Sequence, residues 1–480
     1  MRRVPAGPST DGAQRAVQSF GRALGKWLGG LSLLWLVGPH CASADAPIDI
    51  EPGLAPVGAV EFGGSLELIR EALKHTALGQ RPGDDVRTSK QELQLQLSYH
   101  ASERLSALGE IKWQAERQTH ADATPRLVEQ DVERGESWLH WRRLFDDDIS
   151  IKIGRQNFVE PRRWWWDDDL DALRFDYARD SWRFTLGLAE AFARKSSQEN
   201  FIDPRDEDVL RWLGHAHWRL SSAWQFSAFY LRQRDDSPRH AIDSLVPTGR
   251  ADTSDAALQW LGLRAAGDVT LSHGGTLGYW VDTATVTGDE TVFEYRTEDG
   301  GTSRVVSSRE QRVRGYAVDA GLVWKPSATR GPTLALSHAR GSGDSDLGDG
   351  VDHAFRQTGL HDPTQEFRTY GELLRPELSN LSVTTATMGF AVHRASRVTL
   401  GYHRFRQAYP AAFLRDARIN LLPTGQDRDI GREISLLLEI GEWETLRAVL
   451  AVADFKAGPA FGAAAGEHAR SAFLEFTFEF

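Results

Sequence analysis

The last ten residues of the chain place the strongest constraint on its fold. In the segment from Ser471 to Phe480, apolar side chains alternate with polar ones, and the chain closes on an aromatic residue. A repeat of two residues puts one set of side chains on each face of an extended strand. The segment therefore predicts a terminal β-strand with one aromatic face and one polar face. Such a strand suits either a membrane barrel or a soluble sandwich.

The N-terminal segment has the three parts of a secretory signal peptide. Five basic residues precede an apolar stretch at 27–37, and Ala42-Ser43-Ala44 supplies the small residues of a cleavage site. An apolar stretch of this length is too short to cross a membrane as a helix. We therefore predict a signal peptide over 1–44 and a mature chain that starts at Asp45.

The charged residues of the mature chain argue against one class of partner. Beyond residue 44 there are 51 Lys and Arg against 66 Asp and Glu, which gives a net charge of −15. Domains that bind nucleic acid are basic, so we expect no nucleic-acid partner. Only 8 of the chain's 56 cations are Lys, which leaves 48 Arg, a side chain that binds carboxylates through two parallel hydrogen bonds. The single cysteine, Cys41, lies in the signal peptide, so the mature chain has neither disulfides nor thiolate metal sites.

Segments that suit β-strands follow one another along the whole mature chain. In several of them, such as 93–99 and 434–440, apolar and polar residues alternate. We find no convincing 3.6-residue period that would favour a helix beyond the signal peptide. We expect eighteen strands, approximately at 57–72, 89–101, 103–117, 136–145, 148–157, 170–178, 180–191, 209–220, 222–233, 255–266, 269–285, 312–325, 331–340, 381–394, 396–408, 429–440, 443–455 and 468–480.

The connections between these strands alternate between long and short. Short turns such as Gly267-Asp268 and Gly441-Glu442 separate the members of one set of neighbours. The other neighbours are separated by long polar segments at 73–88, 118–135, 158–169, 192–208, 234–254, 286–311, 341–380, 409–428 and 456–467. Antiparallel outer-membrane barrels have long extracellular loops and short periplasmic turns. The chain is therefore predicted to be an all-β, transmembrane, antiparallel up-and-down barrel of about 18 strands in the bacterial outer membrane.

The sixteen Trp residues agree with a barrel surrounded by outer-membrane lipid. Many of them lie near the ends of the expected strands, where membrane barrels place aromatic belts at both interfaces. The predicted domains are the signal peptide at 1–44, a periplasmic segment at 45–56 and the barrel at 57–480.

The sequence offers little support for an enzyme. It has no Gly-x-Ser-x-Gly elbow, phosphate-binding loop or His-Glu-x-x-His motif. His215 and His217 share a strand face and could ligate a metal, but such a pair more often lines a polar lumen. The acidic run Asp167-Asp168-Asp169 could bind calcium at a loop, although such runs are usually only solvated. We therefore expect no catalytic residue, no metal and no cofactor.

The polar faces of the strands are the informative ones for function. Because the apolar face of each strand contacts lipid, the polar face lines the lumen. This rule places one acid and several arginines inside the barrel, at Arg142, Arg174, Asp176, Arg183, Arg211, Arg219 and Arg447. Arg155 has the parity of the lipid face, and we expect a β-bulge at Gly154 to turn it inward. Arginines that line a pore concentrate anions and repel cations, so the lumen favours passage of an anion, with stabilisation of the barrel by Arg–carboxylate pairs as the alternative.

Three sequence blocks resemble the alginate export porins of the outer membrane. The first joins Ile153-Gly154-Arg155-Gln156 to Trp164-Trp165-Trp166-Asp167 and Leu170-Asp171-Ala172-Leu173. The second joins Ala339-Arg340-Gly341-Ser342-Gly343 to Phe355-Arg356-Gln357-Thr358-Gly359-Leu360 and Glu377-Leu378-Ser379-Asn380-Leu381. The third is Asp429-Ile430-Gly431-Arg432-Glu433. The blocks lie in the same order as in the family and span most of the mature chain.

This resemblance implies an eighteen-stranded monomer that secretes alginate, a polyuronate, through an Arg-lined constriction. It assigns a selectivity role to Arg142, Arg155, Arg174, Arg340, Arg356 and Arg375. It also implies a periplasmic exopolysaccharide export complex as a partner. An uptake porin for acidic oligosaccharides, a lipid-acting barrel enzyme using His273, His338 or His403, and a structural barrel with a plugged lumen are the alternatives.

Overall fold

The computed structural model describes residues 56–79, 84–120, 127–144, 147–272, 274–326, 331–346, 348–361 and 370–480. The predicted signal peptide and nearly all of the predicted periplasmic segment therefore lie outside the described residues, as does His273. Within the described residues, no helix is long and apolar enough to span a membrane.

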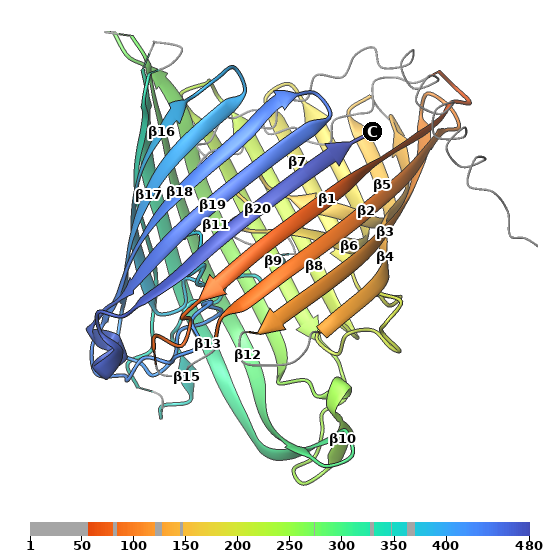
Figure 1. Ribbon diagram of the computed structural model, residues 1–480. Coiled ribbons are helices and arrows are strands. Elements are labelled where there is room, and N and C mark those ends of the chain that lie inside the picture. The colour runs from red at the N-terminus through yellow and green to blue at the C-terminus, as the bar shows by residue number, and fades with distance from the viewer. Residues whose placement is uncertain are drawn as a thin grey trace, which may run out of the picture.

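Eighteen antiparallel strands within the described residues form a single closed sheet (Figure 1). They are β1 (Val60–Lys74), β2 (Val86–His100), β3 (Leu105–His120), β4 (Leu127–Arg142), β5 (Ile149–Val159), β6 (Asp167–Arg179), β7 (Trp182–Ala189), β8 (Val209–Arg219), β9 (Gln225–Asp235), β11 (Ser254–Thr270), β12 (Thr276–Glu298), β13 (Thr302–Lys325), β14 (Thr333–Gly341), β16 (Leu381–Ala391), β17 (Ser396–Gln407), β18 (Asp429–Trp443), β19 (Leu446–Ala457) and β20 (His468–Glu479). The predicted fold and strand number are confirmed.

The barrel closes where the last strand meets the first. β20 pairs with β1 from Ser65↔Glu479 to Lys74↔Arg470, and β1 pairs with β2 along almost its whole length. Closure leaves no unpaired sheet edge, which is the condition for a β-structure to cross a lipid bilayer. The aromatic face of the C-terminal strand is thus part of the wall, and Phe476 and Phe478 are exposed on its outside.

The alternation in the sequence becomes an apolar outside and a polar lumen. On β14, Leu334 and Leu336 are 40% and 58% exposed, whereas Ala339, which has the opposite parity, is 2% exposed. On β18, Ile434 and Leu436 are exposed and Glu433 is buried. Since neighbouring strands pair in register, the exposed leucines and aromatic residues of successive strands form a continuous lipid-facing band.

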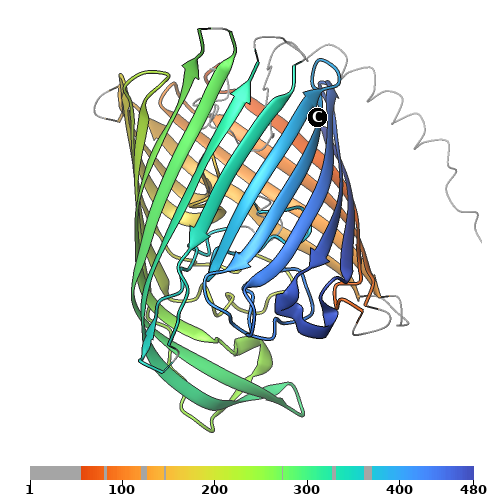
Figure 2. The ribbon, with the colours of Figure 1, turned by 90° about the vertical axis from the view of Figure 1, so that its left-hand side faces the viewer.

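The two ends of the barrel differ as predicted, although two of the predicted loops are mostly strand. Short turns and the C-terminus lie at one end, and the longer connections lie at the other (Figures 1 and 2). One of them is 286–311, which was predicted as a loop. This prediction was wrong, because β12 and β13 continue through it as a paired hairpin that projects beyond the barrel. The predicted gap at 118–135 is likewise mostly strand, since β3 reaches His120 and β4 starts at Leu127.

Two short strands are added at the long-loop end. β10 (Leu245–Pro247) pairs with the projecting part of β13, and β15 (Val351–Asp352) pairs in parallel with the same strand. Two 3₁₀ helices, η2 (Thr248–Arg250) and η3 (Pro459–Ala464), lie in the connections at this end.

Candidate functional site

Two connections at the long-loop end pack against each other and against the inside of the barrel wall. We call residues 160–166 the tryptophan loop and residues 342–380, without the undescribed positions 347 and 362–369, the long loop. Trp164 stacks on Phe355 with ring centroids 6.2 Å apart, and the backbone N–H of Asp167 donates to Leu360 at 2.8 Å. Thr358 donates its hydroxyl to the backbone carbonyl of Trp165. Much of the described part of the long gap predicted at 341–380 is therefore packed against the tryptophan loop and the wall.

Glu160 organises the tryptophan loop. Its carboxylate accepts backbone N–H groups from Arg162 at 3.0 Å, from Trp165 at 3.1 Å and from Trp164. These bonds satisfy the N–H groups of a tight turn that no strand neighbour can reach. The turn aims the Trp165 ring at Phe229 of β9, where the two rings stack 4.8 Å apart.

Six buried residues form an ion and hydrogen-bond network between this loop and the wall, which we call the lumen cluster. Its members are Glu160, Arg162, Arg264, Asp282, Asp319 and Tyr370. Arg264 of β11 donates to Glu160 and to Asp282, at 2.6 Å in each case. Arg162 donates to Asp282 and, at 3.0 Å, to Asp319 of β13. Two cations thus face three carboxylates, and each cation bridges the loop and the strands.

Within the lumen cluster, Tyr370 links Asp319 to the ring of Trp164 in the tryptophan loop. Tyr370 donates its hydroxyl to Asp319 at 2.9 Å and accepts from Trp164 Nε1 at 2.8 Å. Burial and the Asp319 carboxylate raise the pKa of the Tyr370 phenol well above its usual value, so the phenol stays a donor. For Glu160, burial alone would raise the pKa of the carboxyl, but Arg264, the backbone N–H groups and Arg162 outweigh it and lower that pKa to about 2. Glu160 is therefore ionised at neutral pH.

The long loop is fixed to the wall at two further points. Arg356 binds Glu290 of β12 and, at 2.6 Å, Asp352. Farther around the wall, Glu433 of β18 accepts the backbone N–H groups of Glu372 at 2.6 Å, Leu373 at 3.1 Å and Leu374 at 2.9 Å. The described parts of the long loop thus contact the wall at both β12 and β18.

Further cations lie on the inner wall of β4 to β7, and we call Arg142, Lys152, Arg174 and Arg183 the basic wall. Lys152 is buried, and the three arginines are half-buried. Lys152 of β5 lies opposite Arg174 of β6 in the strand register. Arg174 Nε lies 2.9 Å from Asp176, which also accepts the Thr185 hydroxyl at 2.7 Å. Arg142, Arg174 and Arg183 keep part of their surface exposed, unlike the arginines of the lumen cluster. They offer guanidinium groups to the lumen.

The inner wall of β1 to β3 is acidic instead. Glu67 lies opposite Glu92 in the register of β1 and β2. Glu92 binds Lys90 at 2.9 Å, and Glu110 of β3 lies 3.5 Å from Lys112. The described lumen therefore has sides of opposite charge rather than a ring of arginines.

The structure separates the predicted site residues into groups. Arg142, Arg174, Asp176 and Arg183 come together on the basic wall, as expected from their parity. Arg211 and Arg356 are buried, and each is paired with an acid; Arg211 donates to Asp206 at 2.8 Å. Arg447 and the half-buried Arg219 lie on inner faces of β19 and β8.

Two of the arginine predictions fail on geometry. Arg340 was expected in a lumen-facing loop, but it lies in β14, is exposed and shares the outer face with Leu334 and Leu336. The β-bulge expected at Gly154 is absent, because the ladders of β5 with β4 and with β6 both run without a register shift. Arg155 is nevertheless buried, and its Nε has no hydrogen-bond partner among the described residues.

Arg375 lies within the segment that Glu433 holds. Its Nε donates to the carbonyl of Glu372 at 2.8 Å, and its backbone has a positive φ of 43°. Burial, with Arg418 nearby, lowers the pKa of the Arg375 guanidinium to about 9. This arginine helps to shape the long loop and is 7% exposed.

The histidines and the acidic run that the sequence singled out lie at several separate places, although the rings of His215 and His217 are 6.3 Å apart. His215 stacks on Phe229, and His217 Nδ1 lies 3.0 Å from the Ser227 hydroxyl. His338 is on the outer face, and His403 lies 2.9 Å from Thr385. Residues 167–169 begin β6 instead of forming a loop, with Asp167 3.2 Å from Arg163 and Asp169 3.1 Å from Asn157.

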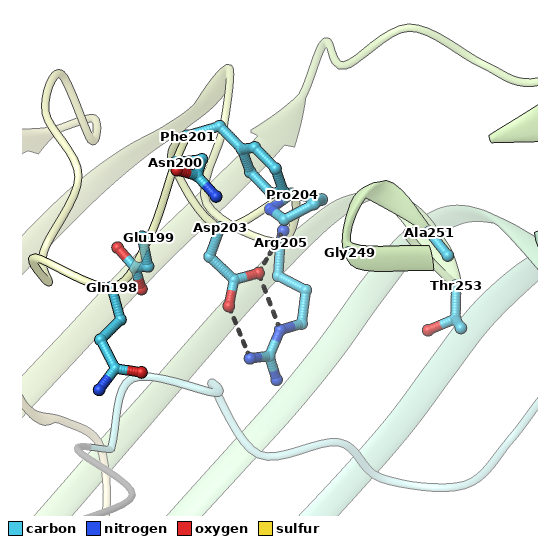
Figure 3. Close-up of a pocket in the computed structure, with 10 residues that line it drawn as sticks. All are labelled: Gln198, Glu199, Asn200, Phe201, Asp203, Pro204, Arg205, Gly249, Ala251 and Thr253. Carbon is cyan, nitrogen blue, oxygen red and sulfur yellow. Dashed lines mark hydrogen bonds and ion pairs between the residues drawn. The ribbon is translucent and has the colours of Figure 1, made fainter. Parts of the chain in front are cut away.

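A different acidic group lies near the long-loop end, together with a small surface pocket. Carboxylate oxygens of Asp235, Asp252 and Asp255 all lie within 4.8 Å of one another. Burial and the neighbouring acids raise the pKa of the Asp252 carboxyl to about 6. The pocket beside it is lined by Phe201 and by the pair Asp203 and Arg205, whose side chains point toward each other (Figure 3). In this pocket the exposed Arg205 lies 2.8 Å from Asp203.

Sequence reasoning missed the lumen cluster. Alternation along β11, β12 and β13 could have placed Arg264, Asp282 and Asp319 on the inner face, since each lies between outward residues. No signal in the sequence shows that the tryptophan loop folds back to meet them.

Solved outer-membrane proteins share this architecture. The structure of OccK5 (OpdH) of Pseudomonas aeruginosa matches with a TM-score of 0.52 at 10% identity, covering 88% of this chain and 98% of that one. The outer membrane protein opdK of the same organism matches with a TM-score of 0.53 at 10% identity, covering 88% and 99%. At this identity the likeness concerns the fold. The closed barrel with its polar lumen is an outer-membrane porin-type β-barrel.

The particular family follows from the sequence match. The family model described as alginate export matches residues 59–475, and the chain belongs to that family. The alginate production protein AlgE of Pseudomonas aeruginosa is 26% identical over 305 residues, covering 60% of this chain and 59% of the relative. AlgE of Azotobacter vinelandii is 24% identical over 305 residues, covering 60% and 61%. Each match spans about three fifths of the relative's length.

Proposed function

We propose that this chain forms a channel that passes an anionic exopolysaccharide, alginate or a similar polyuronate, from the periplasm to the cell exterior. The observation that supports this function is the basic wall, whose three arginines are partly exposed inside a closed barrel although the chain as a whole is acidic. Membership of the alginate export family supports the same substrate class.

The basic wall suits a polymer with one carboxylate on each sugar. Arginine binds a carboxylate through two parallel hydrogen bonds, so neighbouring arginines can hold successive sugars. Conduction also requires that no site binds too tightly. Asp176 meets this requirement, because it competes with the polymer for Arg174 from 2.9 Å away. The acidic wall of β1 to β3 repels the polymer and keeps it near the arginines.

The partners follow from this role. The proposed channel is a monomer in outer-membrane lipid, anion-selective, without a cofactor or catalytic residue, and it receives polymer from a periplasmic export complex. An uptake porin for acidic oligosaccharides would use the same wall, and the direction of polymer flow in vesicles distinguishes the two.

The test is conductance of the purified protein in planar bilayers, with and without polymannuronate. We expect anion selectivity in salt gradients and block of the current by the polymer. Arg174→Ala and Arg183→Ala should each weaken the block by about tenfold, the effect of losing one charge-assisted contact. Arg340→Ala is the matched control, because it removes the same charge from the outer face and should leave both properties unchanged. Cation selectivity, or polymer block that is equal in all variants, would contradict the proposed function.

A further inference from the structure

Three exposed arginines gather on the outer face of the barrel, outside the lumen. Arg70 of β1, Arg87 of β2 and Arg117 of β3 have the parity of lipid-facing residues and are all exposed. Ser89 lies opposite both Arg70 and Arg117 in the strand register, so Arg87, two residues along β2, is diagonal to both. Diagonal neighbours lie within reach of long side chains. We call these three residues the outer arginine triad.

The triad lines one shallow groove with an apolar floor. The groove has a volume of about 360 Å³, and Ala72, Ala472 and Leu474 contribute to it beside the arginines. The seam between β20 and β1 runs through it, since Leu474 lies opposite Arg70. The groove therefore joins positive charge to apolar surface, as the headgroup region of a lipid requires.

The charges of the triad meet no neutralising partner in the part of the chain that the structure describes. Among the described residues, no hydrogen bond or ion pair engages the guanidinium groups of Arg70, Arg87 or Arg117. The one carboxylate that lines the groove, Glu71, binds Arg418 at 2.6 Å. Two other outer-face arginines near the same end are paired, Arg404 with Asp429 at 2.8 Å and Arg470 with Asp454 at 3.2 Å. Neighbouring like charges without a counter-ion attract anions.

The position of the triad identifies the source of the anion. Along β1, the apolar residues Leu66 and Leu68 precede Arg70 on the outer face, and Lys74 follows it toward the long-loop end. On β3, Ile111 and Trp113 precede Arg117 in the same way. The triad thus lies at the border of the lipid-facing band on the extracellular side. At that depth an outer membrane presents the phosphorylated glucosamine headgroup of lipopolysaccharide.

We propose that the outer arginine triad binds the phosphate groups of lipopolysaccharide, with the acyl chains along the apolar strip below it. Guanidinium groups match phosphate oxygens through pairs of parallel hydrogen bonds, and basic pockets at membrane borders bind anionic headgroups. The bound lipid covers the seam at which the first and last strands close the barrel. This inference rests on the outer-membrane location and does not depend on what the lumen transports.

The test compares lipid binding to two charge-matched variants in detergent by native mass spectrometry. One variant combines Arg70→Gln, Arg87→Gln and Arg117→Gln. The control combines Arg340→Gln, Arg404→Gln and Arg432→Gln, three exposed residues on the outer faces of β14, β17 and β18. Affinity for diphosphorylated lipid A should fall by about tenfold or more in the triad variant and stay within about twofold of wild type in the control.

The choice of probes separates phosphate recognition from other binding. Dephosphorylated lipid A should bind the wild type and the triad variant equally weakly. Equal binding of diphosphorylated lipid A to the wild type and the triad variant would overturn the proposal. So would tighter triad-dependent binding of polymannuronate than of lipid A, which would make the groove a polysaccharide site. If the triple variant does not show the heat-modifiable mobility of a folded barrel, Arg87→Gln alone should still lower lipid A affinity.

Discussion

Arg264 and Glu160 are separated by 104 residues in the chain and meet at 2.6 Å inside the barrel. Both side chains are buried, one on the wall strand β11 and the other at the start of the tryptophan loop. Their contact joins the loop to the wall, and Arg162 extends it to Asp282 and Asp319. Several predictions about stability depend on this junction.

Removing the carboxylate of Glu160 should lower the free energy of unfolding. Glu160→Gln leaves Arg264 and Arg162 buried with one fewer carboxylate, and breaking a buried ion pair costs about 3–5 kcal/mol. The free energy of unfolding in urea, followed by Trp fluorescence in lipid vesicles, measures the effect. Asp203→Asn is the control, since its partner Arg205 is 79% exposed and such a surface pair contributes less than about 1 kcal/mol. Similar losses in the two variants would show that the network does not support the barrel.

The Glu160 carboxyl should also make the free energy of unfolding sensitive to acid. The pKa of Glu160 is about 2 in the folded protein against an ordinary 4.5, so the unfolded chain binds more protons between these values. The stabilisation from Glu160 is fully present above pH 4.5 and is lost as the pH falls toward 2. The unfolding free-energy gap between wild type and Glu160→Gln should therefore be smaller at about pH 3 than at about pH 6. A gap that stays constant would contradict the ion-pair explanation.

Glu433 should control how firmly the long loop is held. Its carboxylate accepts three consecutive backbone N–H groups, and Glu433→Ala leaves all three without this acceptor. We expect the 372–374 segment to detach in part, giving larger current fluctuations and faster proteolysis of the loop. Ser435→Ala changes a buried residue on the same inner face and should leave the current trace as in wild type. Quiet currents in both variants would show that the loop is held by other contacts.

A small substitution in the wall should disturb the tryptophan loop. The ring of Trp165 covers Gly262 of β11 so closely that a Cβ there would overlap the ring. Gly262→Ala should therefore destabilise the barrel by about 1–3 kcal/mol, the usual cost of overpacking. Gly214→Ala on β8 meets only ordinary contacts, the nearest at 3.5 Å, and should change stability by less than about 0.5 kcal/mol. The unfolding free energies of the two variants, together with Trp165 fluorescence, test whether the added methyl group disturbs the tryptophan loop.

The wall of the barrel was predictable because its signals are local. A period of two residues sets which side chains meet lipid, and in the strand register Arg142, Arg174 and Arg183 have the parity of the inner face. The same local signals also explain why the predictions for 286–311 and Arg340 were wrong. The hairpin of β12 and β13 continues past the membrane band with many polar residues, so 286–311 was predicted as a polar loop although Phe293 and Val305 are buried in it. Arg340 was assigned to the lumen from its place in a motif, although its alternation with Leu336 pointed outward.

The sequence by itself determined the membrane barrel, its eighteen strands and the two unlike ends, because alternation and loop length are properties of neighbouring residues. Only the tertiary structure decided how the lumen is filled. Glu160, Asp282 and Tyr370 come from three distant segments, and their meeting depends on the register of many strands and on loops that fold back inside. The same closure brings Leu474 beside Arg70 and so forms the outer groove. Contacts of this kind leave no periodic trace in the chain, since each residue alone is only a polar or apolar side chain in a strand or loop.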